Sequence, residues 1–357
     1  MITLVLTNRN RNLHIVKKCL DSLEQQTEKD FKLFFVDYGS DEEYFLELEK
    51  LIFEYSKILF IKCSVSGQLW NKSRAINIAL KKCTTDFFFV GDIDMLFHTD
   101  FVRKLYKLKK EKSVIYFQVG FLNEEETKLD KDFFNSNVSF VSQKEATGMT
   151  LYPAKLLREI NGYDEFYHGW GAEDTDVHIR LQNSGIEVEF YNHETLLKHQ
   201  WHPKNYRSKN SAQPFHFNLE KVNHSYISFS QITKRTLVNV NIDWGVMPDE
   251  SHYLKLLQDP DFIIEILPEK AKIDGFISQM SNFKNKIISF VIKDPIPSNK
   301  IKQEVKKVFG KKSLEFLSLE KVNDMILQEI VIHYRNLPYK YFFDQKKKEI
   351  QLKIYFP

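Results

Sequence analysis

Short apolar segments alternate with amphipathic segments over the first part of the chain, and this alternation constrains the fold more than any other feature. Apolar runs of strand length are separated by stretches with helical spacing. Continuous apolar strands joined by helices are typical of a mostly parallel sheet covered on both faces, so we predict an α/β fold. The predicted strands are Ile2–Leu6, Phe31–Val36, Ile58–Ile61 and Phe87–Val90, and the predicted helices are His14–Leu23, Glu42–Tyr55 and Asn71–Lys82.

Composition narrows the class of protein. The chain has 357 residues, 43% of them hydrophobic, which is enough for a large domain plus a smaller one. The net charge is only +3 and basic residues are interspersed with acidic ones, so we expect no nucleic-acid partner. Three widely spaced cysteines, with no signal-type leader and no apolar run long enough to span a bilayer, favour a cytoplasmic protein.

Polar residues follow three of the predicted strands. They are Thr7–Arg11, Asp37–Ser40 and the pair Asp92 and Asp94. In parallel sheets, ligands bind beyond the carboxyl ends of the strands. The three segments are therefore expected to share one site.

Asp92 and Asp94 are two residues apart, so in extended backbone their side chains project to the same side. Carboxylate oxygens are the ligands that hard divalent cations prefer, and a diphosphate supplies more of them. The alternative is a pair of loop carboxylates that cap the next helix. The position directly after a buried strand favours a metal site.

The segment from His168 to Asp176 contains two glycines, an indole and three carboxylates, directly before a predicted helix. Acidic residues in the first turn compensate the helix dipole, which is the simplest reading. The preceding Gly169-Trp170-Gly171 is not explained in that way. Glycines permit tight turns, the indole offers a flat face to a sugar ring, and a carboxylate held there can act as a general base.

Other candidate residues are weaker on their own. His199 and His202 flank a tryptophan, and imidazole is a borderline ligand for a manganese-like ion, although a single histidine is more often structural. Lys72 and Arg74 open a helix, where phosphate binds, but taken alone they are better explained as an ordinary solvated basic turn.

Five motifs occur together in an order that resembles a known family. The chain is similar to GT-A-fold glycosyltransferases of family 2, especially the branch that includes chondroitin polymerases and β-1,4-galactosyltransferases. The resemblance covers about residues 1–210. The motifs are Thr7–Arg11, Val36–Ser40, Trp70–Asn77, Asp92–Asp94 and Gly169–Asp174, with Asn161-Gly162-Tyr163 leading into the last.

The resemblance implies a role for each candidate residue. Asp174 is expected to be the catalytic base, with Glu173 orienting the acceptor. Asp94 and His199 are expected to bind Mn²⁺ or Mg²⁺. The galactosyltransferase branch has a third, methionine ligand where this chain has Leu196, so His202 is expected to contribute instead. The residues expected to bind the UDP-sugar and its acceptor are Thr7, Arg9, Arg11, Asp37, Lys72, Arg74, Asp92 and Trp170.

By this resemblance we expect a GT-A catalytic domain over 1–215. It would be an inverting, metal-dependent transferase that moves a hexose or N-acetylhexosamine from a UDP-sugar to a glycan or lipid-linked glycan, in bacterial surface polysaccharide synthesis. A retaining transferase, a sugar nucleotidyltransferase and a non-catalytic carbohydrate-binding protein remain as alternatives. Residues 216–357 are expected to form a smaller, mainly helical domain. Its Lys-rich helices fit either contact with the inner face of a membrane or ordinary amphipathic packing.

Overall fold

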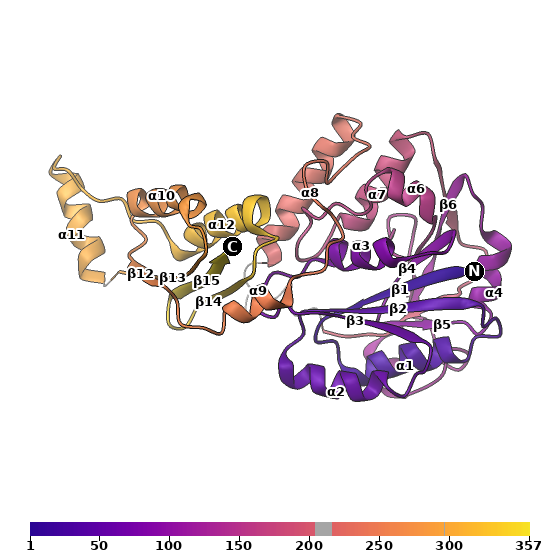
Figure 1. The fold of residues 1–357 in the computed structure, drawn as a ribbon. Helices are drawn as coiled ribbons and strands as arrows, with labels where there is room; N and C mark the ends of the chain where they lie inside the picture. Colours follow the sequence, from indigo (N-terminus) through magenta and orange to yellow (C-terminus); the bar gives the residue numbers. More distant parts are fainter. Residues whose placement is uncertain (204–215, 296) are drawn as a thin grey trace. The chain divides into compact units, whose positions relative to one another are not determined.

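The computed structural model describes residues 1–203, 216–295 and 297–357, which form two compact units (Figure 1). The first unit contains Met1–Cys63, the described residues from Trp70 to 203, and Glu220–Met247. The second contains Ser64–Leu69, residues 216–219 and the described residues from Pro248 to Pro357. Residues 220–247 therefore lie with the N-terminal unit, which differs from the boundary at residue 215 expected from the sequence.

A seven-stranded sheet in the order β10-β6-β9-β4-β1-β2-β3 forms the centre of the first unit. Neighbouring strands are parallel except where β9 pairs with β4 and β6. The strands are β1 (Ile2–Asn8), β2 (Phe31–Tyr38), β3 (Ile58–Cys63), β4 (Phe87–Asp92), β6 (Ser113–Phe117), β9 (Thr150–Pro153) and β10 (Glu187–Tyr191).

Helices cover both faces of this sheet, as predicted. In Figure 1, α3, α6 and α7 lie on one side of it and α1 and α2 on the other. The helices of this unit are α1 (Leu13–Glu24), α2 (Glu42–Ile52), α3 (Lys72–Lys82), α4 (Phe101–Leu108), α5 (Glu124–Lys128), α6 (Ala154–Glu159), α7 (Glu173–Asn183) and most of α8 (His216–Ile232). The α/β class with a mostly parallel sheet is confirmed.

Local sequence explains where the elements near the site begin. Every residue of β1 is buried, because β2 and β4 flank it and helices cover both faces. The Asn12 side chain accepts hydrogen bonds from the backbone at the start of α1, and Asn71 does the same for α3. These two caps fix the chain just beyond the strand ends, where the polar motifs lie.

A second, four-stranded sheet in the order β5-β11-β7-β8 extends the first unit beside the end of β4. It consists of β5 (Met95–Phe97), β7 (Val119–Phe121), β8 (Phe140–Val141) and β11 (Leu197–His199). Because β5 follows β4 after two residues, this sheet carries side chains directly to the carboxyl edge of the central sheet.

The second unit combines helices with a sheet of its own, in the order β12-β13-β15-β14. The expectation of a mainly helical domain is therefore incomplete. Alternate residues of β15 are buried, and Phe276 of α10 packs on Phe290 of β13, so one face of the sheet is covered. The elements are α9 (Glu250–Lys255), β12 (Phe262–Ile266), α10 (Lys270–Gln279), β13 (Lys286–Lys293), α11 (Pro297–Val308), α12 (Leu319–Glu329), β14 (Tyr339–Asp344) and β15 (Glu349–Phe356). Among the described residues, no helix is both long and apolar enough to cross a bilayer.

Candidate active site

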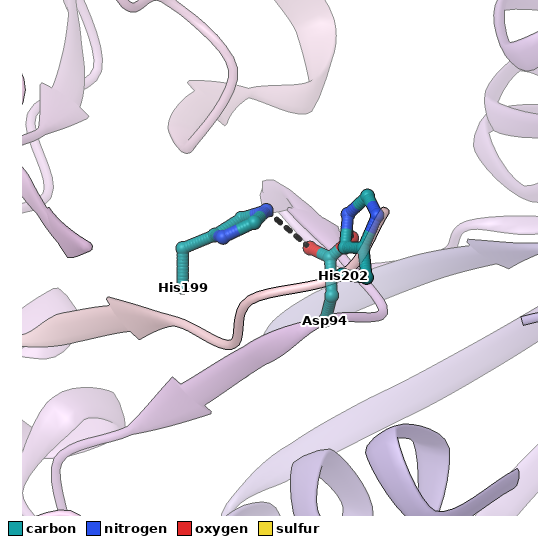
Figure 2. A group of neighbouring side chains, drawn as sticks. All are labelled: Asp94, His199 and His202. Carbon is teal, nitrogen blue, oxygen red and sulfur yellow. Dashed lines mark ion pairs between the residues drawn. The ribbon is translucent and has the colours of Figure 1, made fainter. Parts of the chain in front are cut away.

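Asp94, His199 and His202 converge at the junction of the two sheets of the first unit (Figure 2). Their ligand atoms lie within 4.8 Å of one another. His199 Nε2 is 3.7 Å from Asp94 Oδ1, and His202 Nε2 is 3.1 Å from Asp94 Oδ2. The backbone fixes this arrangement, because the amide of Gln200 donates to the carbonyl of Asp94 over 2.9 Å.

The chemistry of this cluster fits a divalent cation. Asp94 is 5% exposed, and no described residue donates a hydrogen bond to its Oδ1. A buried carboxylate oxygen without a donor is costly unless a cation completes its surroundings. One carboxylate and two imidazoles are ligands that a manganese-like ion accepts. The residues present therefore fit the predicted metal, and Leu196 is buried in the core, away from any ligand role.

Charges around the cluster favour the forms that bind metal. Burial acts to raise the pKa of Asp94, but His199, His202 and Arg11 outweigh it and hold that pKa below its usual value. Burial lowers the pKa of His199 despite the neighbouring carboxylate. Asp94 is therefore ionised and His199 is neutral at pH 7, as ligation requires. Arg11 Nη2 lies 3.2 Å from Asp94 Oδ2.

A second cluster surrounds Lys72, the first residue of α3. Its ammonium lies 3.0 Å from Asp92 Oδ1, 3.0 Å from Asp174 Oδ2 and 3.6 Å from Glu173 Oε1. Three carboxylates therefore share one lysine, which joins the end of β4 to the start of α7. The two acids of the Asp92–Asp94 pair therefore have different partners. Asp92 contacts Lys72, whereas Asp94 contacts the two histidines.

Asp174 has the properties of a proton acceptor. Burial, reinforced by Glu173 and Asp92 and opposed by Lys72, raises the pKa of Asp174 to about 7. Its Oδ2 accepts from Lys72, and its buried Oδ1 has no hydrogen-bond donor among the described residues. A carboxylate with a pKa near neutrality and an oxygen without a donor suits general base catalysis.

The turn before α7 explains why glycine flanks Trp170. Gly169, Gly171 and Ala172 have φ of 74°, 100° and 75°, in the left-handed region that glycine adopts without strain. The Trp170 side chain is 41% exposed, as a stacking surface requires. Asn223 of α8 is buried, and its amide donates to the carbonyls of His168 (2.9 Å) and Trp170 (3.3 Å).

The residues expected to bind the donor have mixed surroundings. Asp37 is buried at the end of β2 and accepts from Asn8 over 2.7 Å and from the Ser40 hydroxyl over 2.6 Å, and burial raises its pKa. Arg9 lies close enough to Asp37 to oppose that rise. Thr7 is buried on β1. Arg74 donates to the carbonyl of Val246 over 3.1 Å, so its guanidinium also has a structural role.

Two residues of the site were not predicted. Gly148 lies just before β9, and a Cβ there would stand 3.3 Å from Asp174 Oδ2 and 3.7 Å from Asp92 Oδ2. Asn223 supports the Trp170 turn from a helix that begins after the polar region near residue 205. Neither belongs to a recognisable motif. Only the three-dimensional position of each residue reveals its role.

Comparison with known families agrees with this geometry. Residues 3–155 match the model of glycosyl transferase family 2, and residues 128–202 match that of the N-terminal domain of galactosyltransferase. Residues 3–202 are therefore similar to glycosyltransferases. The enzyme class predicted from the sequence is thereby confirmed, and the GT-A fold class agrees with these matches. The branch within the family and the role of each site residue remain predictions.

The solved structures found to be similar share little sequence identity with this chain. Staphylococcus aureus TarS residues 1–349 share 14% identity at a TM-score of 0.44, with 56% of this chain and 60% of that one covered. The mannosyltransferase PcManGT of Pyrobaculum calidifontis, solved with GDP-Man and Mn²⁺, shares 13% identity at 0.42, with coverage of 65% and 72%. GalNAc-T7, solved with UDP, GalNAc and Mn²⁺, shares 12% identity at 0.49, with coverage of 65% and 48%. No curated protein matches the chain.

Proposed function

We propose that the protein is an inverting, metal-dependent transferase that moves a hexose or N-acetylhexosamine from a UDP-sugar to a hydroxyl of a glycan acceptor. One observation carries the proposal. A cation-binding cluster at Asp94 and a proton-accepting carboxylate at Asp174 occur in the same unit, in a chain that matches glycosyltransferase families.

Each cluster supplies a different part of the reaction. Asp174 accepts the proton of the acceptor hydroxyl while that oxygen attacks the anomeric carbon, and the bond from this carbon to the diphosphate oxygen breaks. Attack opposite the leaving group inverts the anomeric configuration. Asp94, His199 and His202 would hold the cation, which as a Lewis acid supplies charge neutralisation for the departing UDP. Lys72 keeps Asp174 near Asp92 and partly offsets the rise in its pKa.

The biological setting follows from the same proposal. A transferase of this kind fits bacterial surface polysaccharide synthesis at the cytoplasmic face of a membrane, with a glycan or lipid-linked glycan as acceptor. Thr7, Arg9, Arg11, Asp37 and Arg74 stay proposed contacts to the donor.

Donor hydrolysis tests the proposal without knowledge of the acceptor. The purified protein is incubated with a panel of UDP-sugars and with Mn²⁺, Mg²⁺ or EDTA, and released UDP is measured. We expect release from one or a few donors, dependent on the cation and lost in Asp94→Ala. Cation-independent release, or release unchanged in Asp94→Ala, would refute the metal-dependent mechanism. NMR of the transferred sugar then decides between inversion and retention.

A further inference from the structure

A row of aromatic side chains crosses the four-stranded sheet from the metal cluster to the edge strand. His199 on β11 is paired in register with Phe121 on β7, and Phe121 is paired with Phe140 on β8. Residues paired directly across neighbouring strands lie on the same face of a sheet. The three rings are therefore consecutive neighbours, and the row begins at a residue of the proposed metal site.

Ring geometry shows that the row is continuous. The Phe121 and His199 centroids are 4.9 Å apart at an interplanar angle of 32°, and the Phe121 and Phe140 centroids are 4.6 Å apart at 4°. Such spacings are those of stacked aromatic pairs. Although Phe140 stacks on Phe121, its side chain is 60% exposed. A large apolar ring thus stands open at the end of the row.

The chain that follows Phe140 leads back to the carboxylates. Residues 143–145 are exposed and polar, and Gly148 lies beside Asp174 and Asp92. Hydrogen bonds to the backbone hold this segment in place. Gln118 donates to the carbonyl of Ser142 over 3.0 Å, and Tyr116 donates to that of Lys144 over 2.9 Å. A fixed strip therefore connects the exposed ring with the proposed base.

The geometry points to Phe140 as a stacking platform for a sugar ring of the acceptor, at a position removed from the hydroxyl that reacts. This inference rests on the proposed function. An exposed ring with polar residues beside it suits a pyranose, which has an apolar face and hydroxyls around its rim. Asp37, a proposed contact to the donor, lies on β2 in the other sheet, so the acceptor is the better occupant.

The test compares two phenylalanines of equal exposure. Phe140→Ala removes the platform. Phe134→Ala is the matched control, because Phe134 is 61% exposed and packs on His98, outside the row from His199 to Phe140. Phe140→Trp retains a stacking ring. Binding of each protein, loaded with UDP and Mn²⁺, is measured on an array of defined bacterial oligosaccharides, and donor hydrolysis is measured in parallel.

We expect Phe140→Ala to weaken glycan binding by up to about tenfold, as loss of an aromatic stack does, with donor hydrolysis unchanged. Phe134→Ala and Phe140→Trp should bind as the wild type does. Equal binding by Phe140→Ala and the wild type, equal losses in both alanine variants, or no glycan bound by the wild type would overturn the inference. If the wild type does not hydrolyse any donor, the proposed function itself is refuted.

Discussion

At the scale of single residues, burial and neighbouring charges give the carboxylates of the site different pKa values and so different proposed roles. Asp94 is buried and the side chain of Asp174 is only 14% exposed, yet their pKa values move in opposite directions. Asp94 faces two imidazoles and a guanidinium, whereas Asp174 shares one lysine with two other acids. Asp94 therefore stays ionised and can bind a cation, whereas Asp174 can exchange a proton near neutral pH.

The raised pKa of Asp174 predicts the pH dependence of transfer. The base must be ionised, and its folded pKa of about 7 lies above the ordinary value of 3.8. Activity should therefore be low at pH 5 to about 6 and should rise through about pH 7. Initial rates at saturating donor, measured from acid to neutral pH, check this. A profile that is flat across that range would contradict the assignment.

Lys72 should set the position of that rise. Its ammonium lowers the pKa of Asp174, so Lys72→Met should move the acid limb to higher pH. Lys50→Met, which removes an exposed lysine paired with Glu47, is the control and should leave the profile unchanged. The measurement is the pH profile of transfer for both variants. A shift to lower pH in Lys72→Met would contradict the role of Lys72 in lowering the pKa of Asp174.

At the scale of elements, helix α8 supports a loop that lies more than 40 residues before it in sequence. Asn223 joins α8 to the turn around Trp170, and Arg235, just after α8, pairs with Asp164 over 2.9 Å. These contacts explain why residues 220–247 lie with the first unit. Trp170 is thus positioned from outside the segments that match the two families.

Asn223→Ala should loosen the turn. The substitution removes the hydrogen bonds to the carbonyls of His168 and Trp170, and because each such bond typically contributes about 0.5–1.5 kcal/mol, unfolding should cost about 1–3 kcal/mol less. We expect a lower midpoint in urea denaturation together with a lower kcat/KM. Asn183→Ala is the control, since this exposed asparagine also donates to a backbone carbonyl, that of Arg235, but lies away from Trp170. Equal effects of the two substitutions on kcat/KM would show that α8 does not position the turn.

The same elements show what sequence could predict. Strands β1 to β4 of the central sheet were predictable because each is a short apolar run. Asp94 was predictable because it follows a strand end, and His199 because of the family resemblance. Gly148 was not, since nothing local distinguishes a glycine whose role is to leave room for two carboxylates. In the second unit, Ile350, Leu352 and Ile354 alternate with polar residues, which is a weak strand pattern. The prediction of a mainly helical domain did not take this pattern into account.

At the scale of the whole molecule, we expect part of the second unit to contact a membrane surface. Residues 300–312 contain six lysines and one glutamate, although the whole chain has a net charge of only +3. Within this segment Val308 and Phe309 are 83% and 73% exposed. Exposed apolar side chains among lysines are typical of segments that contact anionic lipid surfaces.

Vesicle flotation checks this expectation. We expect the protein to float with anionic phosphatidylglycerol vesicles and not with neutral phosphatidylcholine vesicles. Replacing Lys306, Lys307 and Lys311 by Glu should reduce binding by about tenfold or more, since each lysine near such a surface contributes about 1 kcal/mol. The exposed lysines at 346–348, replaced in the same way, are the control. Equal loss in both variants would indicate non-specific charge attraction only.

The central claim is that Asp174 is the base of a metal-dependent transfer, and the Asp174→Asn variant tests it most directly. The amide keeps the size of the side chain but cannot accept the proton, so transfer should fall by about 10²–10⁴-fold. Binding of UDP with Mn²⁺, measured by calorimetry, should remain, because Asp94, His199 and His202 are untouched. Transfer at the wild-type rate by a variant that still binds UDP and Mn²⁺ would contradict the account.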